Sequence, residues 1–327
     1  MLSLVSKLYG KVAGLRNALY ERGIVETHDL GAFTVSIGNI TTGGTGKTPL
    51  VAYVAQLLAD RGEKVCILTR GYGREDVSRR LLVTEDSEPV IAGDEPVELA
   101  QRLGEKAIVI ADRDRVAAAE WARRKFKSTA FVLDDGFQHR RAGRDLDIVC
   151  IDATNPFGGG QMLPAGYLRE PAENLSRADA IVITRTDLVD DLTAVENEIK
   201  RLAPDAAVFE CRNTIRTIRP RDPDAKEFDK KEGCFAFCGL GNPDNFVSLL
   251  ADQKLFFAGI KAFRDHHKYT QSEIETIEGA ARAAGAEALL TTAKDAVKLG
   301  NLRFTLPCFV VEIDVKLNDP TAFANLF

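Results

Sequence analysis

The chain of 327 residues lacks any apolar run of the roughly 18–20 residues that a membrane-spanning helix needs. It also lacks an excess of positive charge: its formal net charge is −5, so the whole-chain field gives no reason to expect a nucleic-acid partner. We find no internal repeats and no low-complexity tract. A composition of 45% hydrophobic and 28% charged residues is typical of a soluble globular protein long enough for two domains.

Paired metal-binding cysteine motifs are also lacking. Cys234 and Cys238 form a C-x3-C pair, but no second Cys/His pair completes a tetrahedral zinc site. Several of the six cysteines lie within apolar, strand-like runs. We therefore expect buried free thiols in a reducing cytoplasm.

A glycine-rich segment follows an apolar run at 33–37 and precedes a helical pattern at 49–59. Strand, glycine loop and helix in this order make a phosphate cradle, because backbone N–H groups and the positive end of the helix dipole converge on an anion. The pattern G-x-x-x-x-G-K-[ST] is not met in full, since residue 41 is Thr; the segment is closer to GGxGKT loops. In such loops the lysine contacts the β- and γ-phosphates and the last Thr helps to hold Mg²⁺. The predicted nucleotide-binding residues are Thr41, Thr42, Gly43, Gly44, Thr45, Gly46, Lys47 and Thr48.

A second motif, LDDGFQH at 133–139, places acids at the end of an apolar strand. A P-loop enzyme needs a carboxylate there, because the carboxyl ends of parallel strands meet beside the phosphate loop and a carboxylate holds Mg²⁺. Asp134 is the predicted metal-side residue and Asp135 its neighbour in the same site. His139 is a candidate for orienting a substrate group or a carboxylate; a surface histidine on a turn is the alternative.

The N-terminal segment 1–23 has apolar residues at helical spacing, interrupted by basic residues. A basic amphipathic helix can lie in the plane of a membrane surface. Packing of this helix on its own domain is the alternative, and the sequence does not choose between them. The apolar positions are Leu4, Leu8, Val12, Leu15 and Leu19.

Strand-like and helical segments alternate from residue 33 to residue 184, and the strands are continuously apolar. This pattern predicts an α/β fold: a P-loop α/β/α sandwich with a mainly parallel sheet. A polar stretch within 212–232 suggests a linker, and strand-like runs beyond it predict a second, smaller α/β/α domain. The expected division is therefore 1–211, a linker at 212–232, and 233–327 closing over the active site.

Motifs spread from about residue 35 to residue 295 resemble those of tetraacyldisaccharide 4′-kinase, an enzyme family of lipid A biosynthesis. GGTGKTP joined to DDGFQH is the specific combination. Further matching segments are LTRGYGR (68–74), GDEP (93–96), LPAGYLREP (163–171), FCGLGNP (237–243), FRDHHKYT (263–270) and TTAKD (291–295). The resemblance implies transfer of the γ-phosphate of ATP, with Mg²⁺, to the 4′-hydroxyl of a tetraacylated glucosamine disaccharide 1-phosphate. It implies a peripheral enzyme at the cytoplasmic face of the inner membrane. No obligate protein partner is inferred.

The resemblance also suggests roles for single residues. Asp94 is similar to the family's catalytic aspartate, the base that accepts the proton of the attacking hydroxyl, and His266 to its partner in a dyad, so domain closure would bring the two together. A helix cap is the alternative for Asp94. Arg113, which follows a strand, could place a guanidinium on the transferring phosphate; a surface ion pair is the alternative. Glu170 is implied as a further metal-side carboxylate, with an ion pair to Arg169 as the alternative.

Two other function classes remain open from the residues. One is a P-loop GTPase or metallochaperone-type switch, suggested by the Thr-Arg-Thr-Asp tetrad at 184–187, in which Asp187 could read a nucleotide base or merely cap a helix. The other is a soluble kinase of a small molecule.

Overall fold

The computed structural model describes residues 2–253 and 255–327. The described residues form one 12-stranded sheet in the order β10-β9-β11-β12-β8-β7-β6-β1-β5-β2-β4-β3. The strands are β1 Phe33–Gly38, β2 Val65–Thr69, β3 Leu81–Val83, β4 Ala107–Ala111, β5 Ala130–Asp134, β6 Leu146–Asp152, β7 Ala180–Thr184, β8 Ala207–Pro220, β9 Cys234–Cys238, β10 Phe257–Ala262, β11 Ala288–Thr292 and β12 Cys308–Leu317. The helices are α1 Leu2–Glu21, α2 Lys47–Asp60, α3 Pro89–Ala92, α4 Asp94–Leu103, α5 Arg115–Phe126, α6 Thr193–Leu202, α7 Pro243–Ala251, α8 Gln271–Ala283, α9 Ala293–Ala296 and α10 Pro320–Ala324.

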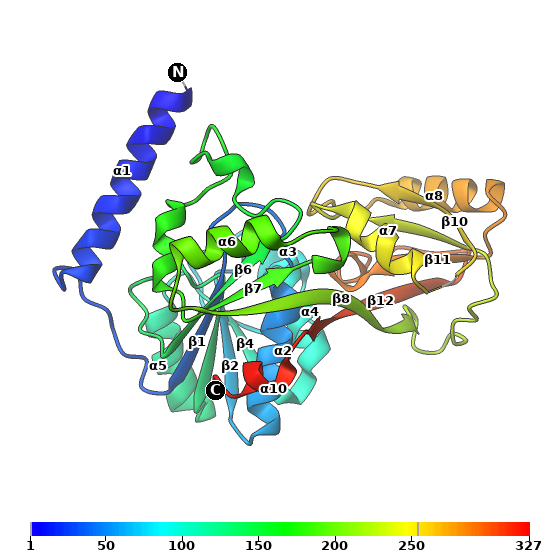
Figure 1. The fold of residues 1–327 in the computed structure, drawn as a ribbon. Helices are drawn as coiled ribbons and strands as arrows, with labels where there is room; N and C mark the ends of the chain where they lie inside the picture. The colour runs from blue at the N-terminus through cyan, green and yellow to red at the C-terminus, as the bar shows by residue number, and fades with distance from the viewer. Residues whose placement is uncertain (1, 254) are drawn as a thin grey trace.

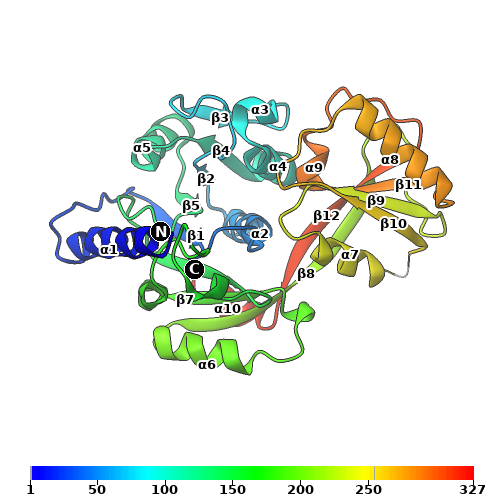
Figure 2. The same cartoon turned by 90° about the horizontal axis from the view of Figure 1, so that it is seen from above.

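The sheet carries helices on both faces and extends through two lobes (Figures 1 and 2). In the first lobe, built on β1–β7, alternate residues of each strand point to opposite faces. Val35 and Ile37 of β1 pack toward α2 and α4, whereas Phe131 and Leu133 of β5 pack toward α5. The second lobe, built on β9–β11, is covered by α7 on one face and α8 on the other. The predicted α/β class with a mostly parallel sheet is confirmed.

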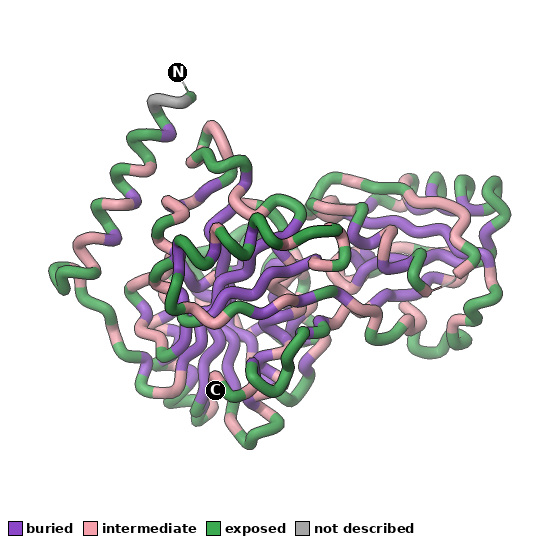
Figure 3. Tube along the Cα trace, viewed as in Figure 1, coloured by how far each residue is buried: buried purple, intermediate pink, exposed green. Residues whose placement is uncertain are grey.

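Most central strands of the sheet, such as β1, β2, β5, β6, β7, β9 and β11, form the buried interior and are mainly purple in Figure 3. Neighbouring strands are parallel except at β3–β4 and β8–β12, which pair antiparallel. In the first lobe β1 lies between β5 and β6. The loop after β1 and the acids after β5 therefore leave the same edge of the sheet, side by side.

The expected linker at 212–232 is partly wrong. Residues 212–220 belong to β8, which pairs with β12 from Cys211 to Pro220 and carries the sheet from one lobe into the other. Only 221–232 forms an irregular connection. The end of the chain also returns to the first lobe: Phe323 of α10 is fully buried there, and Arg61 donates to the carbonyl of Phe327.

No helix among the described residues is long and apolar enough to span a membrane.

Candidate active site

A cleft of about 980 Å³ lies at the carboxyl edge of the first lobe, and both lobes line it. On one wall, the phosphate loop leads from β1 into α2. Gly46 caps α2 in the left-handed region at φ 74°, a conformation that glycine adopts without steric cost. Lys47 is the first residue of α2, and its Nζ lies 3.4 Å from Thr45 Oγ1 and 3.6 Å from Asp135 Oδ1. Residues 42–48 and the N-terminus of α2 line the cleft. Backbone N–H groups of such a loop and the positive end of the helix dipole favour binding of an anion.

Of the predicted nucleotide-binding residues, 42–48 line this cleft. Thr41 does not. It is 6% exposed and forms a β-bridge with Leu168, so it anchors the base of the loop. The assignment of Thr41 to the ligand surface is therefore wrong.

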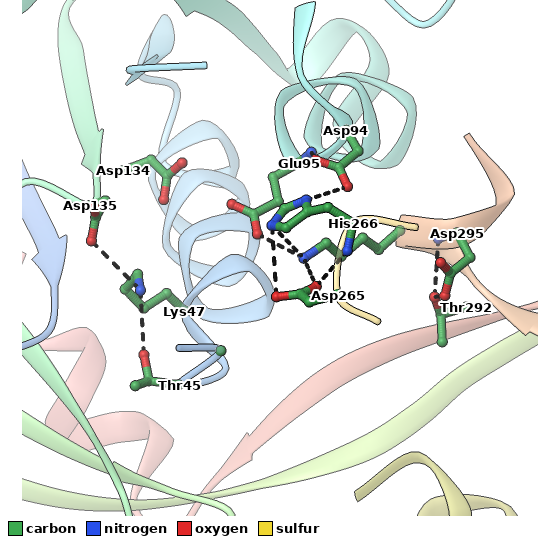
Figure 4. Close-up of polar contacts among 12 residues, drawn as sticks. Thr45, Lys47, Asp94, Glu95, Asp134, Asp135, Asp265, His266, Thr292 and Asp295 are labelled. Carbon is green, nitrogen blue, oxygen red and sulfur yellow. Dashed lines mark hydrogen bonds and ion pairs between the residues drawn. The ribbon is translucent and has the colours of Figure 1, made fainter. Parts of the chain in front are cut away.

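Asp134 and Asp135 follow β5 into the cleft (Figure 4). Asp134 accepts a hydrogen bond of 3.0 Å from Thr69 Oγ1. Burial, with the nearby charges of Glu95 and Asp135, raises the pKa of Asp134 to about 6. Asp135 is half-buried; desolvation opposes its ionisation, but Lys47 and Arg169 outweigh this and hold its pKa below the usual range. Arg169 Nη1 lies 2.9 and 2.7 Å from its two carboxylate oxygens.

These oxygens fit a magnesium ion. Mg²⁺ prefers carboxylate and hydroxyl ligands, and here Thr48, Asp134 and Glu95 line the cleft beside the phosphate loop. The raised pKa of Asp134 means that its neighbours leave it under-neutralised. A divalent cation would offset that repulsion and neutralise charge on the phosphates.

Asp94 and His266 meet across the two lobes. His266 Nδ1 lies 2.8 Å from Asp94 Oδ2, although 172 residues separate them (Figure 4). The hydrogen bond from His266 to the Asp94 carboxylate raises the pKa of His266, against the effects of burial and of Lys294. Burial opposes the ionisation of Asp94, yet His266, Lys294 and Lys298 together lower its pKa. The pair therefore holds a carboxylate against an imidazole, an arrangement suited to accepting a proton.

Lys294 of α9 joins the lobes at the same point. Its Nζ lies 3.1 Å from Glu95 Oε1 and 3.0 Å from Asp265 Oδ1, and 3.4 Å from the second imidazole nitrogen of His266. Glu95 and Asp94 are consecutive at the start of α4. The second lobe therefore contacts the start of this helix twice, through Lys294 to Glu95 and through His266 to Asp94.

Arg113 is not in the site: it is exposed and does not line the cleft. Arg115, two residues later, lies in the cleft where Arg113 was expected. It is 4% exposed, lines the cleft, and donates from Nη2 to the carbonyl of Asp134 at 2.8 Å. Asp114 caps α5, which turns Arg115 inward and leaves Arg113 outside.

Glu170 is not placed as a metal ligand. It is fully buried, does not line the cleft, and four side-chain donors already occupy its oxygens: Asn17, Gln138, Asn174 and Arg177. Its ion-pair partner is Arg177 rather than Arg169.

His139 lines the cleft near the phosphate loop. Burial, together with the positive charges of Arg115 and Arg144, lowers its pKa to about 4. The imidazole is therefore neutral at physiological pH, so it can orient a group by hydrogen bonding but carries no positive charge.

Three site residues have backbone in the left-handed region, where non-glycine residues are strained: Asp135 at φ 53°, Arg185 at φ 59° and His266 at φ 58°. Such strain, of order 1–3 kcal/mol each, concentrates at functional sites. Arg185 is the residue of the Thr-Arg-Thr-Asp tetrad at 184–187 that contacts the phosphate loop. It pairs with Asp152 and donates to the Gly44 carbonyl, so it supports the phosphate loop, whereas Asp187 does not line the cleft.

Sequence reasoning gave no catalytic role to Glu95, Arg169 or Lys294, although the matching TTAKD segment placed Lys294 as a residue that could lie near the cleft. Glu95 follows Asp94 in the GDEP motif, which was a usable signal. The contacts of Arg169 and Lys294 depend on chain segments distant in sequence, and no local pattern predicts them.

A phosphate loop, an acidic pair beside it and a carboxylate–histidine pair opposite define a P-loop phosphotransferase whose active site lies between two lobes. The family model of tetraacyldisaccharide-1-P 4′-kinase (LpxK) matches residues 1–327. The chain belongs to this family.

Similar proteins agree with that assignment. A tetraacyldisaccharide 4′-kinase of Geobacter metallireducens is 36% identical and covers 98% of this chain and 94% of its own. One from Desulfotalea psychrophila is also 36% identical, over 93% of this chain and 89% of its own. The crystal structure of LpxK from Aquifex aeolicus, in complex with ATP, is 32% identical, covers 98% of this chain and 96% of its own, and superposes with a TM-score of 0.78.

Proposed function

We propose that this chain transfers the γ-phosphate of ATP to the 4′-hydroxyl of a tetraacyl glucosamine disaccharide 1-phosphate, giving the lipid A precursor lipid IVA. The observation that carries the proposal is the contact between the buried Asp94 and His266, because His266 lines the same cleft as the phosphate loop. A sugar hydroxyl is a weak nucleophile, so a positioned base assists its attack. Family membership supplies the substrate class.

The residues divide the work as follows. The loop at 42–48 cradles the phosphates, and Lys47 stabilises charge on the transferring group. Asp94 and His266 accept the proton of the attacking hydroxyl. Thr48 and Asp134, with Glu95, would hold Mg²⁺, which supplies positive charge to the phosphates when bound. Arg115 and Arg169 fix the acidic pair in place.

The reaction is tested by incubating the protein with γ-labelled ATP and the tetraacylated disaccharide 1-phosphate. We expect label at the 4′ position and no label on free glucosamine 1-phosphate, a small polar acceptor. Transfer only to the small acceptor would instead favour the soluble small-molecule kinase. GTP-dependent hydrolysis without transfer would favour the switch protein.

We further propose that α1 attaches the enzyme to the cytoplasmic face of the inner membrane. Exposed apolar side chains lie along one side of the helix, with Lys7 and Lys11 also exposed on it. Apolar burial and attraction to anionic headgroups would both favour the interface. The apolar residues are Leu2, Val5, Leu8, Val12 and Leu15, each between 47% and 63% exposed; Leu19 is half-buried, and the side chain of Leu4 is outside the described part.

Vesicle sedimentation tests this. Replacing Leu8, Val12 and Leu15 by Ser should release the protein from vesicles of phosphatidylethanolamine and phosphatidylglycerol. Phe256→Ser removes an equally exposed apolar side chain, 62% exposed, from the second lobe and should not. Equal vesicle binding by both variants would show that the apolar residues of α1 do not attach the protein to the membrane.

A further inference from the structure

Helix α1 buries polar residues as well as Ala13 on its inner side, whereas most of its large apolar residues are exposed. Asn17 is 2% exposed and Ser6 is 6% exposed, whereas Leu8 and Leu15 are each 63% exposed. Figure 3 shows the helix as largely exposed, with separate buried positions along it. Directional hydrogen bonds therefore contribute strongly to its attachment, and such bonds fix position more narrowly than apolar contact does.

Asn17 of α1 contacts a buried carboxylate. Its Nδ2 donates to Glu170 Oε2 at 2.8 Å. Glu170 is fully buried, and a buried carboxylate is tolerated only when its oxygens are hydrogen-bonded. Asn17 is one of the four donors that hydrogen-bond to these oxygens. Without Asn17, one oxygen of Glu170 would lose a hydrogen bond in a buried site, which is unfavourable, and the carboxylate could move toward its three remaining donors.

Glu170 in turn fixes Gln138. Gln138 Nε2 donates to Glu170 Oε1 at 2.8 Å and to the carbonyl of Asn39 at 2.8 Å. Two acceptors on the nitrogen determine which way the amide faces. Its oxygen is thereby directed to accept from Arg169 Nη1 at 3.3 Å.

Arg169 completes the connection. The same Nη1 contacts both oxygens of Asp135, which lies 3.6 Å from Lys47 Nζ. A continuous series of polar contacts therefore runs from α1 to the phosphate-loop lysine. A misplacement of about 1 Å at a phosphoryl-transfer site can cost on the order of 10²-fold in rate.

We propose that α1 braces the phosphate site, with Asn17 and Glu170 as positioning residues that act through Gln138 and Arg169 on Asp135 and Lys47. The helix then contributes to turnover as well as to membrane attachment. The proposal rests on the kinase activity but not on the membrane proposal, so turnover and vesicle binding are measured separately.

The experiment compares Asn17→Ala with Ser6→Ala. Both remove a buried polar group from the inner side of α1, but Ser6 Oγ contacts the backbone N–H of Ala165, which lies outside the connection to Arg169. Kinetics use the tetraacylated substrate in neutral detergent micelles, with kcat expressed per molecule that binds ATP so that partial unfolding does not lower it.

Asn17→Ala should lower kcat about 5- to 10-fold, with KM for ATP changed less than about 2-fold and vesicle binding unchanged. Ser6→Ala should leave all three as in the wild type, and Asn17→Gln, which keeps a donor amide, should recover part of the loss. A kcat for Asn17→Ala equal to that of Ser6→Ala would overturn the proposal.

Glu170→Gln provides a second route. Because Asn17 acts through Glu170, the double variant with Asn17→Ala should turn over within about 2-fold of Glu170→Gln alone. Multiplicative losses would mean that Asn17 does not act through Glu170, and the brace would be rejected. No transfer in the wild type would instead reject the proposed function itself.

Discussion

The Asp94–His266 pair gives the sharpest test of the chemistry. Its Nδ1–Oδ2 distance of 2.8 Å is that of a charge-assisted hydrogen bond, and it leaves the second imidazole nitrogen on the Lys294 and Asp265 side. A positioned general base contributes about 10²- to 10⁴-fold to a rate. We therefore expect His266→Ala to lower kcat by that amount while KM for ATP stays near normal.

Non-additivity separates one base unit from two independent roles. If Asp94 acts by orienting and charging His266, then Asp94→Asn and His266→Ala together should cost little more than the worse single change. Losses that multiply in the double variant would refute the unit. Circular dichroism of each variant, with and without ATP, checks that the lobes remain folded.

The pH profile supplies an independent reading. His266 accepts a proton only when it is neutral, so kcat rises as the pH passes its pKa. The contact with Asp94 raises that pKa, and Asp94→Asn removes the carboxylate charge that does so. The acidic limb of the profile should therefore move to lower pH in Asp94→Asn, while the maximum rate falls. An unmoved limb would show that the titrating base is another group.

Three further changes have defined outcomes. Lys47→Ala should remove most transfer with the fold retained, because its charge stabilises the transferring phosphoryl group; near-normal transfer would contradict the P-loop assignment. Lys294→Ala should shift the acidic limb to higher pH, since its positive charge lowers the pKa of His266; a shift to lower pH would contradict this. Asp134→Asn should abolish transfer yet stabilise the free protein at pH 8 by about 1–3 kcal/mol, measured by urea unfolding in EDTA. The sign follows because the folded pKa of about 6 lies above the unfolded value of 3.8, so wild-type stability falls as pH rises between them and stays lower above pH 6. An unchanged midpoint would show that Asp134 is already neutralised.

Much of the first lobe was predictable from local patterns. Buried parallel strands are continuously apolar, so β1 and β5 were visible in the sequence, and their carboxyl ends located the phosphate loop and the acids. β8 was missed for the opposite reason. In its second half, charged and polar residues such as Arg212, Thr214 and Arg219 occupy a strand buried only in part, so they resemble a loop.

The errors in the site have a different cause. Arg113 and Arg115 are both plausible after a strand, and the helix cap at Asp114 decides which one faces the cleft. Glu170 was expected near a metal because of its motif. Two of its four donors, Asn17 of α1 and Gln138 after β5, are distant in sequence. Local chemistry identified the right residue types, but tertiary contacts determine which of them touch the ligand.

The connection between the lobes bears on how the site closes. β8 and β12 run through both lobes as one antiparallel pair, seen in Figure 1 as the two long strands that cross the molecule. Their register shifts between Glu312 and Ile313, which places Arg216 as an extra residue on β8. A bulge interrupts the ladder and bends the strand there, so we expect the β8–β12 pair to bend most easily at this point. Bending there would move β9–β11 and α9 relative to α4, making or breaking the His266 and Lys294 contacts with Asp94 and Glu95 together. We propose that this bending couples the Asp94–His266 contact to closure of the cleft.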